Sequence, residues 1–345
     1  FVWGALADPA AMESVLGPGR GFVFAVHVLP TLIFFSAFMA VLYHLGIMQA
    51  VVRAMAAVMV RVLGTSGAES LSACANVFVG QTEAPLLVRP YLPRMTRSEL
   101  HAVMVGGFAT IAGGVFVLYA GFGIDPGHMM VASVMAAPAG VVCSKIAFPE
   151  TEPSETMGRV VRSVERTTGN VVEAAASGAI DGLHLALNVG AMLIAFLGLV
   201  AVVDWMLAGI GGTLFGVAPE DPLTLGRILG WLFSPLAAVM GASFEWREIL
   251  VLGELLGTKI AVTELIAYRE LGVLQESLSP RTVLIATFAL CGFANLGSVA
   301  IQLGGLGAIA PERRKDLAAL GVRAMLVGAL ATCMTACLAG VLSRV

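Results

Sequence analysis

Long apolar stretches separated by short polar segments dominate the chain. Six of them run for about 20 residues or more with at most one charged side chain: residues 22–43, 101–123, 129–148, 182–203, 282–310 and 317–342. A helix needs roughly 20 residues to cross the ~30 Å hydrocarbon core of a bilayer. The pattern therefore predicts six membrane-spanning helices.

Two further apolar stretches are interrupted by prolines and polar side chains. They cover residues 65–97, with Glu83 near the middle, and residues 228–268, which include Glu264. Non-helical backbone at membrane depth is tolerated only where protein or a cavity surrounds it. We therefore expect each stretch to be a re-entrant hairpin, two short helices joined by a tip. Residues 45–63, which carry two arginines, are predicted to form a helix at the membrane interface.

The two interrupted stretches and the spans that follow them look alike. Thr-Glu occurs at Glu83 and again at Glu264, 181 residues later. Gly-Phe-Ala-Thr, ending at Thr110, recurs as Gly-Phe-Ala-Asn, ending at Asn295, after 185 residues. A duplicated pair of interrupted hydrophobic segments is the best sequence-level indication of a secondary-transporter site. The order and the nearly constant offset therefore favour a transporter.

Composition supports a membrane protein and excludes several other classes. The 345 residues are 58% hydrophobic and 12% charged, with a mean hydropathy of +0.90, whereas soluble domains carry about 25% charged residues. This excludes an ordinary soluble domain, a disordered chain and a basic nucleic-acid binder. The apolar surface requires a lipid bilayer as its environment. The chain begins at Phe1, so we expect it to be part of a longer protein with further helices before residue 22.

Other functional classes find little support in the motifs. The five histidines show no HxxxH or HExxH spacing, and the five cysteines form no CxxC pair. An intramembrane hydrolase would need a nucleophile–base pair, and no Ser–His or paired-Asp motif is visible, so no enzymatic activity is expected. A channel is a third alternative, and current without substrate saturation would distinguish it.

Glu83 and Glu264 lie deep in apolar sequence, where an ionisable group must face a cavity or a partner. One interpretation pairs Glu83 with Arg89 and Glu264 with Lys259 in salt bridges. The other has both carboxylates accept hydrogen bonds from an uncharged solute rich in donors. Gln81 offers a donor and an acceptor, which suits an amide-like or nucleobase-like edge.

Further polar groups lie near Asn295 in the second copy of the repeat and near the glycines that follow Thr110 in the first copy. Asn295 and Ser298 are three residues apart on a predicted helical face and could hold hydroxyls. Residues 110–114 read Thr-Ile-Ala-Gly-Gly, which predicts a helix break. Free carbonyls there, with the Thr110 hydroxyl and Asn76, would form an oxygen site suited to a hard cation. A glycine-lined packing face is the alternative.

Residues 76–86, Asn-Val-Phe-Val-Gly-Gln-Thr-Glu-Ala-Pro-Leu, carry a specific resemblance. Together with Phe-Pro-Glu-Thr-Glu at 148–152, Gly-Thr-Lys at 257–259 and Cys-Gly-Phe-Ala-Asn at 291–295, they resemble the concentrative nucleoside transporter family over essentially the whole chain. The resemblance implies an all-α membrane protein with two re-entrant helical hairpins and two broken helices in an inverted repeat. It also implies a homotrimer that imports nucleosides and is driven by a cation gradient.

The resemblance also implies roles for individual residues. The implied substrate-binding residues are Gly80, Gln81, Thr82, Glu83, Val115, Phe233, Glu264, Asn295 and Ser298. The implied sodium ligands are Asn76, Val79, Thr110 and Ile111. The sequence departs from the family pattern at three places. Thr110 stands where serine is common, residues 263–265 read Thr-Glu-Leu instead of Asn-Glu-Phe, and Gly297 and Val299 flank Ser298 where serine and isoleucine are common. The Thr110 departure keeps proton coupling open as an alternative to sodium coupling.

The predicted organisation has five parts. Residues 1–64 form scaffold helices and the interfacial helix, 65–124 the first hairpin and broken helix, and 125–227 further scaffold helices and loops. Residues 228–310 form the second hairpin and broken helix, and 311–345 the last spanning helix. The expectation is a sodium-coupled nucleoside symporter with elevator-like movement, multi-pass in the cytoplasmic (inner) membrane. It has no organic cofactor and no nucleic-acid partner, and the alternative is a proton-coupled nucleoside symporter.

Overall fold

The computed structural model describes residues 4–16, 24–27, 29–159, 168–215 and 222–343. Within these ranges the chain is helical and forms no strand, apart from a single bridge between Ser66 and Met157. The α-helices are α1 (Pro9–Leu16), α2 (Phe24–His27), α3 (Leu29–His44), α4 (Ile47–Leu63), α5 (Gly67–Ala75), α6 (Arg97–Ala109), α7 (Gly113–Gly121), α8 (Pro126–Ala147), α9 (Val171–Phe215), α10 (Leu225–Val239), α11 (Trp246–Ala261), α12 (Glu264–Leu274), α13 (Pro280–Leu290), α14 (Leu296–Ile309) and α15 (Arg314–Leu342). Short 3₁₀ turns are η1 (Gly4–Ala7), η2 (Ala84–Val88), η3 (Leu92–Arg94), η4 (Gln275–Ser277) and η5 (Pro311–Arg313). The predicted all-helical fold is confirmed.

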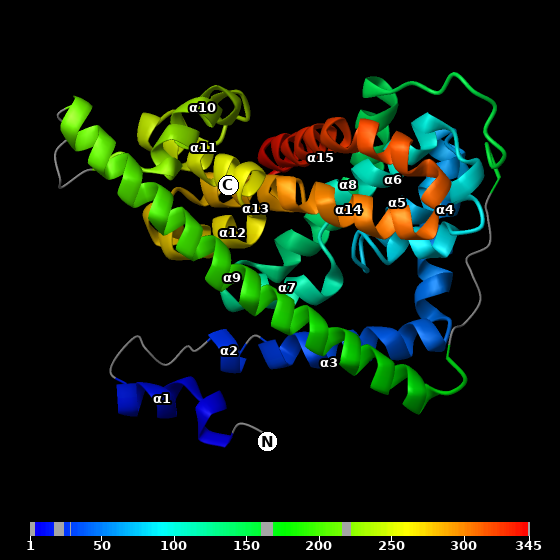
Figure 1. Cartoon of the computed structure of the whole chain (residues 1–345), viewed down its shortest axis with the longest axis horizontal. Coiled ribbons are helices and arrows are strands. Elements are labelled where there is room, and N and C mark those ends of the chain that lie inside the picture. Colours follow the sequence, from blue (N-terminus) through cyan, green and yellow to red (C-terminus); the bar gives the residue numbers. More distant parts are fainter. Residues whose placement is uncertain (1–3, 17–23, 28, 160–167, 216–221, 344–345) are drawn as a thin grey trace.

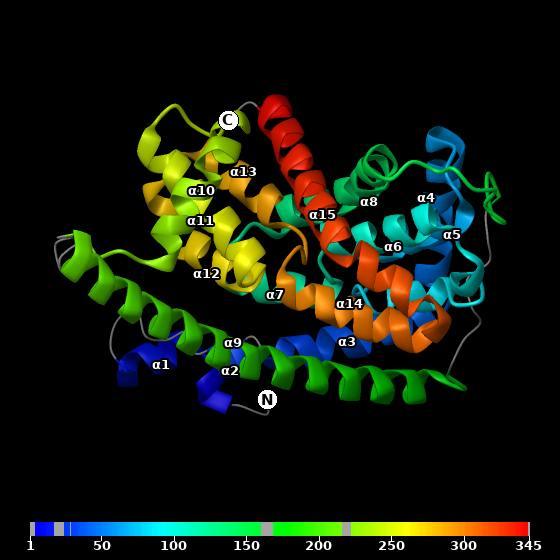
Figure 2. The ribbon, with the colours of Figure 1, turned by 45° about the horizontal axis from the view of Figure 1, so that its top comes forward.

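The internal repeat appears as two series of helices in the same order. The first series is α4, α5, η2, α6, α7 and α8, and the second is α10, α11, α12, α13, α14 and α15. α4 packs on α5 as α10 packs on α11, and α6 packs on α8 as α13 packs on α15. These two series lie together on one side of the molecule (Figures 1 and 2).

The two predicted broken helices are present. Residues 101–123 divide into α6 and α7, and residues 282–310 divide into α13 and α14. The extended segments between the halves meet, because the Phe293 amide donates to the Thr110 carbonyl at 3.3 Å. Gly292 lies at this crossing with φ at +156°, and a Cβ there would come within 2.6 Å of the Phe108 carbonyl oxygen. Only glycine combines that backbone angle with so close an approach.

Long spans are fewer than predicted. In the part of the chain that the structure describes, two helices are long and apolar enough to cross a membrane, Pro126–Ala147 and Pro311–Leu342. The pair Pro30–His44 and Ile47–Leu63, bent by 75°, passes the same test together. The predicted span at 182–203 is the middle of α9, a helix of 45 residues, and residues 22, 23 and 28 of the first span lie outside the described residues.

The hairpins differ from their prediction in two ways. After the tip, the first hairpin continues as the 3₁₀ turns η2 and η3 instead of an α-helix. Pro90 and Pro93 lack amide donors and clash with the preceding turn, which prevents a continuous α-helix there. Residues 228–268 contain parts of three helices and not two, so the two-limbed interpretation of that range was wrong. The tip before Glu264 joins α11 to α12, and α10 is an additional helix packed on α11.

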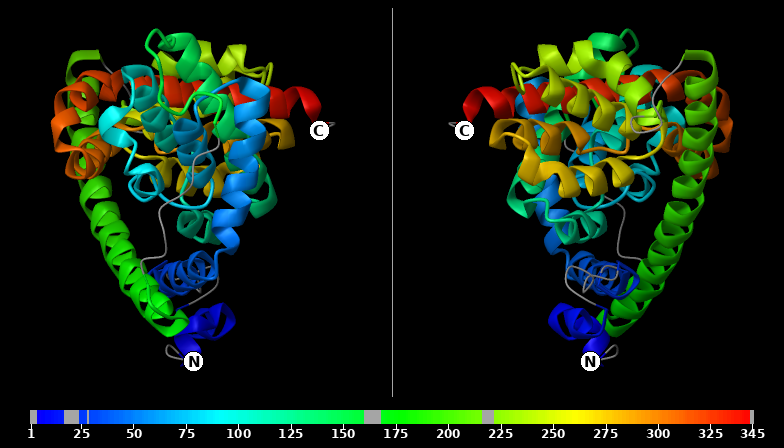
Figure 3. Two further views of the ribbon diagram at one scale, coloured as in Figure 1. Left: turned by 90° about the vertical axis from the view of Figure 1, so that its right-hand side faces the viewer. Right: turned by 90° about the vertical axis from the view of Figure 1, so that its left-hand side faces the viewer.

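α3 and α9 form a separate pair. Figure 3 shows α9 slanting along one side of the molecule, from the end where the N-terminus lies to the opposite end. A Cβ on Gly178 would come within 2.9 Å of the Ala37 Cα, and one on Gly182 within 2.7 Å of the Ile33 Cα. The helices therefore run antiparallel at close range, and this Gly-x-x-x-Gly pair is typical of membrane helix packing.

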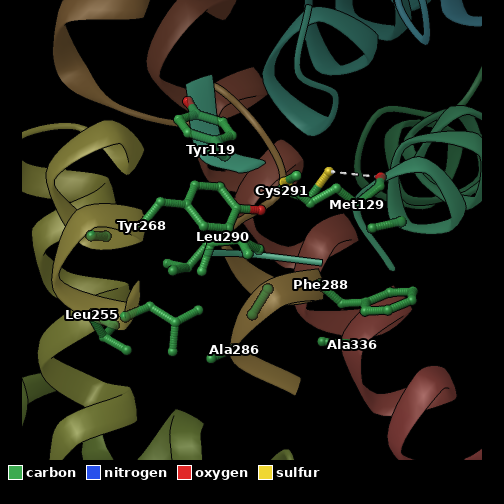
Figure 4. Packing of buried hydrophobic residues seen from close by; sticks show 14 of the residues in the cluster. Tyr119, Met129, Leu255, Tyr268, Ala286, Phe288, Leu290, Cys291 and Ala336 are labelled. Carbon is green, nitrogen blue, oxygen red and sulfur yellow. Dashed lines mark hydrogen bonds between the residues drawn. The ribbon is translucent and has the colours of Figure 1, made fainter. Parts of the chain in front are cut away.

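An aromatic cluster packs beside the broken helices. Tyr119 of α7 stacks on Tyr268 of α12, and their ring centroids are 4.2 Å apart. Figure 4 shows the two side chains side by side. The Tyr268 hydroxyl donates to the Thr287 carbonyl at 2.8 Å, so the buried phenol is satisfied. Leu290 and Cys291, at the end of α13, lie against the two rings (Figure 4). The cluster ties α7, α12 and α13 into one unit.

We expect Gly182→Leu to destabilise the protein, because its side chain must push α3 away from α9. Overpacking of this kind lowers the free energy of unfolding by about 1 to 3 kcal/mol. The matched control is Gly198→Leu, on the same helix, where a Cβ meets nothing within 4 Å. Thermal unfolding in detergent would measure the difference. An equal melting temperature for the two variants would contradict the packing role of Gly182.

Candidate functional site

A cavity of about 1130 Å³ lies where the two repeats face α3 and α9. The tip of the first hairpin, the start of α7, the tip of the second hairpin and the start of α14 line it from the repeats. Polar side chains from α9 line the opposite wall, among them Asp181, His184 and Asn188. All the predicted substrate-binding residues except Phe233 line this cavity: Gly80, Gln81, Thr82, Glu83, Val115, Glu264, Asn295 and Ser298.

The first hairpin presents an amide beside a carboxylate. The Gln81 side chain is 8% exposed, and its Oε1 accepts from Gln302 Nε2 at 3.1 Å. Gln302 also donates to the Met104 carbonyl, so it holds Gln81 against α6. Glu83 is exposed, and the Thr82 hydroxyl donates to it at 3.0 Å. The Gln81 amide NH₂ and the Glu83 carboxylate thus remain available to a ligand.

The second hairpin places Glu264 in a set of donors. Its side chain is 4% exposed and accepts from the Tyr119 hydroxyl at 3.1 Å and from Asn295 Nδ2 at 2.8 Å. The Thr263 hydroxyl adds a third bond at 3.3 Å. These donors fix the carboxylate in one orientation at the cavity wall.

Asn295 does not share a helical face with Ser298 in the way predicted. It is the N-cap of α14, and its Oδ1 accepts from the Ser298 amide at 2.8 Å. Its amide oxygen caps the helix while its NH₂ binds Glu264. Both residues nevertheless line the cavity, because the N-terminus of α14 points to it.

The salt-bridge interpretation of the two glutamates was wrong. Among the described residues, neither Glu83 nor Glu264 has a cationic partner within 4 Å. Lys259 donates instead to the Ala289 carbonyl and the Thr332 hydroxyl. Arg89 is exposed on the far limb of the first hairpin.

Phe233 lies away from the cavity. It is on α10, and a Cβ on Gly257 of α11 would come within 3.1 Å of its ring. Its ring fills the contact between α10 and α11, so its assignment to the pocket wall was wrong. The phenylalanine and tyrosine side chains that line the cavity are Phe35, Tyr43, Phe78, Tyr119 and Phe293.

Two contributors escaped the sequence analysis. Tyr119 and Gln302 hold Glu264 and Gln81. Each is a polar group within an apolar stretch, and that is the signal that could have found them.

Asn76 offers an unused oxygen beside the break between α6 and α7. Its side chain is 1% exposed, and Nδ2 donates to the Ser72 carbonyl, while Oδ1 has no partner among the described residues. The Thr110 hydroxyl donates to the Gly106 carbonyl at 2.8 Å and keeps its lone pairs. The Gly113 amide donates to the Phe78 carbonyl at 3.0 Å, which joins the hairpin tip, next to Val79, to the break at Ile111.

A buried oxygen without a donor requires a partner. The donor set there consists of amide, hydroxyl and carbonyl oxygens, which suits a hard monovalent cation. The described residues contain no cluster of three His, Cys, Asp or Glu that could bind a transition metal.

Comparisons with known proteins agree with this geometry. Residues 128–340 match the family model described as Na+ dependent nucleoside transporter C-terminus, and residues 25–125 match the model described as nucleoside recognition. An uncharacterized transporter of Haemophilus influenzae is 49% identical over 99% of this chain and 80% of its own length. The nucleoside permease NupC of Helicobacter pylori is 43% identical over the same shares. The sodium/nucleoside cotransporter 1 of Mus musculus is 42% identical over 93% of this chain and 51% of its own length.

Solved structures show the same fold. The structure of CNTnw in an inward-facing substrate-bound state has a TM-score of 0.91 and 47% identity, covering 99% of this chain and 79% of that one. A variant of CNTnw in an outward-facing state also has a TM-score of 0.91, with 46% identity. The named relatives are transporters and not enzymes. The chain therefore belongs to the concentrative nucleoside transporter family, as a multi-pass membrane protein.

Proposed function

We propose that this chain is a sodium-coupled symporter that imports nucleosides across the cytoplasmic membrane. One observation carries the proposal: the polar tips of both hairpins face a single cavity large enough for a nucleoside. The first tip contributes Gln81 and Glu83 to the cavity wall. The second tip contributes Glu264, and the start of α14 contributes Asn295 and Ser298. The names of the matching family models and relatives support the substrate class.

Gln81 and Glu83 are assigned to the nucleobase. Gln302 binds the amide oxygen of Gln81, so the Gln81 NH₂ is left to donate. Glu83 can only accept when ionised. A donor beside an acceptor complements a base edge that carries a carbonyl next to an N–H, as uracil does. Thr82 and Gly80 position this pair at the tip, and Val115 packs against the base.

Glu264, Asn295 and Ser298 are assigned to the ribose hydroxyls. A carboxylate that accepts from a hydroxyl forms a charge-assisted hydrogen bond, about twice as strong as a neutral one. Tyr119 and Asn295 already hold Glu264 in place. The site is thus arranged before the sugar arrives, which reduces the entropy lost on binding.

Sodium is assigned to the oxygens of Asn76, Val79, Thr110 and Ile111. The unpartnered Asn76 Oδ1 supports this assignment. An ion there would hold the hairpin tip against the break at Thr110, and the tip carries Gln81 and Glu83. Ion and nucleoside then raise each other's affinity, since coupling between two sites is reciprocal. Proton coupling through Glu83 is the alternative.

The two repeats without α4 are assigned to a moving transport domain, and the α3–α9 pair is assigned to a fixed scaffold. The transport domain comprises residues 65–124 and 228–310. It also takes in α8 and α15, because both pack on α6, which extends the boundaries predicted from the sequence. A homotrimer in the inner membrane would hold the scaffolds still while each transport domain moves.

We expect Glu264→Gln to lower the kcat/KM for uridine uptake about 10- to 100-fold, because a hydrogen bond to a charged group contributes about 1.5–3 kcal/mol. Uptake into proteoliposomes would measure it. Glu276→Gln, an exposed glutamate on η4, is the matched control. Wild-type uptake by well-folded Glu264→Gln protein would remove Glu264 from the site.

Uridine uptake is expected to follow an imposed sodium gradient and to ignore an imposed pH gradient. The Asn76 oxygen can satisfy a metal cation, whereas the amide has no basic site for a proton. Radiolabelled uridine in proteoliposomes, with one gradient applied at a time, decides between the two. Uptake driven by the pH gradient alone would establish the proton-coupled alternative.

Thr110→Val should raise the sodium concentration for half-maximal uptake about tenfold, because it removes one oxygen ligand and keeps the side-chain shape. Thr287→Val is the matched control, since that hydroxyl also donates to the carbonyl four residues earlier in its own helix. Sodium titration of uridine uptake measures both variants. Equal sodium dependence for the two would exclude Thr110 as a ligand.

A further inference from the structure

Lys259 is a buried cation without a carboxylate partner. It lies in the last turn of α11, is 1% exposed, and no Asp or Glu among the described residues comes within 4 Å of its Nζ. An isolated ammonium in an apolar interior is strongly unfavourable unless polar groups solvate it. Ionisable residues at membrane depth are by default functional. None of the roles assigned above uses Lys259.

The partners of Lys259 resemble the ligands of a metal cation. Its Nζ donates to the Ala289 carbonyl at 2.7 Å and to the Thr332 hydroxyl at 2.9 Å. Thr332 gives its own proton to the Ala329 carbonyl, so it can only accept from Lys259. Ala289 lies in the last turn of α13, where the carbonyl ends of a helix carry partial negative charge. The ammonium is therefore held by oxygens of a helix end and a hydroxyl.

Lys259 occupies the place in the second repeat that Asn76 occupies in the first. The two are 183 residues apart, between the 181 that separate the glutamates and the 185 that separate Thr110 from Asn295. Asn76 caps α5, and Lys259 is in the last turn of α11, so each ends the first limb of its hairpin. Each faces the last turn of the next broken helix. A Cβ on Gly106 of α6 would lie 3.5 Å from Asn76 Nδ2, and Lys259 binds Ala289 of α13.

We propose that the Lys259 ammonium acts as a permanent cation of the second repeat. It occupies the position that the exchangeable ion occupies in the first repeat. This inference rests on the proposed ion-coupled function. Lys259 holds the second hairpin against α13 and α15 at all times, and so positions Glu264 five residues further along. The first hairpin has an open oxygen at Asn76 instead, and only that hairpin responds to the ion. Lys259 is a positioning residue and does not touch the nucleoside.

The first test measures uridine binding to purified protein by calorimetry at saturating sodium. Lys259→Met keeps the length and apolar stem of the side chain and removes its charge. We expect its uridine affinity to fall at least tenfold, whereas Lys315→Met, on an exposed lysine of α15, should bind as wild type does. Wild-type affinity in Lys259→Met would overturn the proposal.

Chemical rescue separates charge from packing. Lys259→Ala leaves room for a small amine, and we expect n-propylammonium to restore uridine binding while 1-propanol does not. Restoration by both compounds would assign Lys259 a packing role and overturn the proposal.

A measurement on the wild type keeps the proposal testable if these variants fail to fold. The proposal expects one sodium ion per uridine, from reversal potentials in proteoliposomes, and two or more ions would overturn it. Uridine transport without any sodium dependence would instead contradict the proposed sodium coupling. Where Lys259→Met does fold, its uridine affinity tests the role of Lys259 independently of the coupling ion.

Discussion

Unwound backbone at membrane depth must find hydrogen-bond partners within the protein, and this constraint organises the structure. Lipid offers no donors or acceptors, so every free amide and carbonyl at a helix break needs a partner. Here the Phe293 amide donates to the Thr110 carbonyl, which joins the two breaks, and the Gly113 amide donates to the Phe78 carbonyl, which joins the first break to the first hairpin. Gly292 allows the segments to approach. The two breaks cross each other, and the two hairpin tips line one cavity beside the crossing.

The two glutamates beside the crossing differ in burial and in the number of hydrogen-bond donors that hold them. Glu264 has three donors and is nearly buried, so its orientation is set by the fold. Glu83 has one neighbouring hydroxyl and is exposed to the cavity. A carboxylate with few protein partners can still form charge-assisted hydrogen bonds with a ligand, and these are about twice as strong as neutral ones. The first hairpin is thus the half of the site that a ligand can order.

Much of this arrangement was predictable from the sequence because it follows local rules. Paired glycines after Thr110 indicated a helix break, and charged residues within apolar stretches marked both hairpins. The repeat was visible because Thr-Glu and Gly-Phe-Ala recur in the same order. These signals depend on spacing along the chain, which sequence shows directly. They predicted the broken helices, and eight of the nine predicted substrate-binding residues line the cavity.

The errors concern contacts between distant elements. Phe233 looked like a pocket wall, but its ring packs on Gly257, a contact that depends on how α10 lies against α11. Tyr119 and Gln302 are 145 and 221 residues away from their partners Glu264 and Gln81. One interpretation paired Lys259 with Glu264, five residues on, yet the Lys259 ammonium at the end of α11 binds α13 and α15 instead. Side-chain direction at a helix end cannot be read from residue spacing alone.

The two repeats share an architecture but divide the work of binding between them. A duplicated hairpin needs positive charge at its inner end, because carbonyl ends of broken helices converge there and repel one another. The second repeat meets that need with Lys259, whose charge is part of the chain. In the first, Asn76 presents an oxygen that has no donor among the described residues, and in the proposed function a cation from solution supplies the charge there. A cation that is covalently attached holds its hairpin under all conditions, whereas one that dissociates makes its hairpin conditional on the ion. In the proposed mechanism, the first hairpin is therefore the part that responds to the ion gradient, and the second hairpin stays in place.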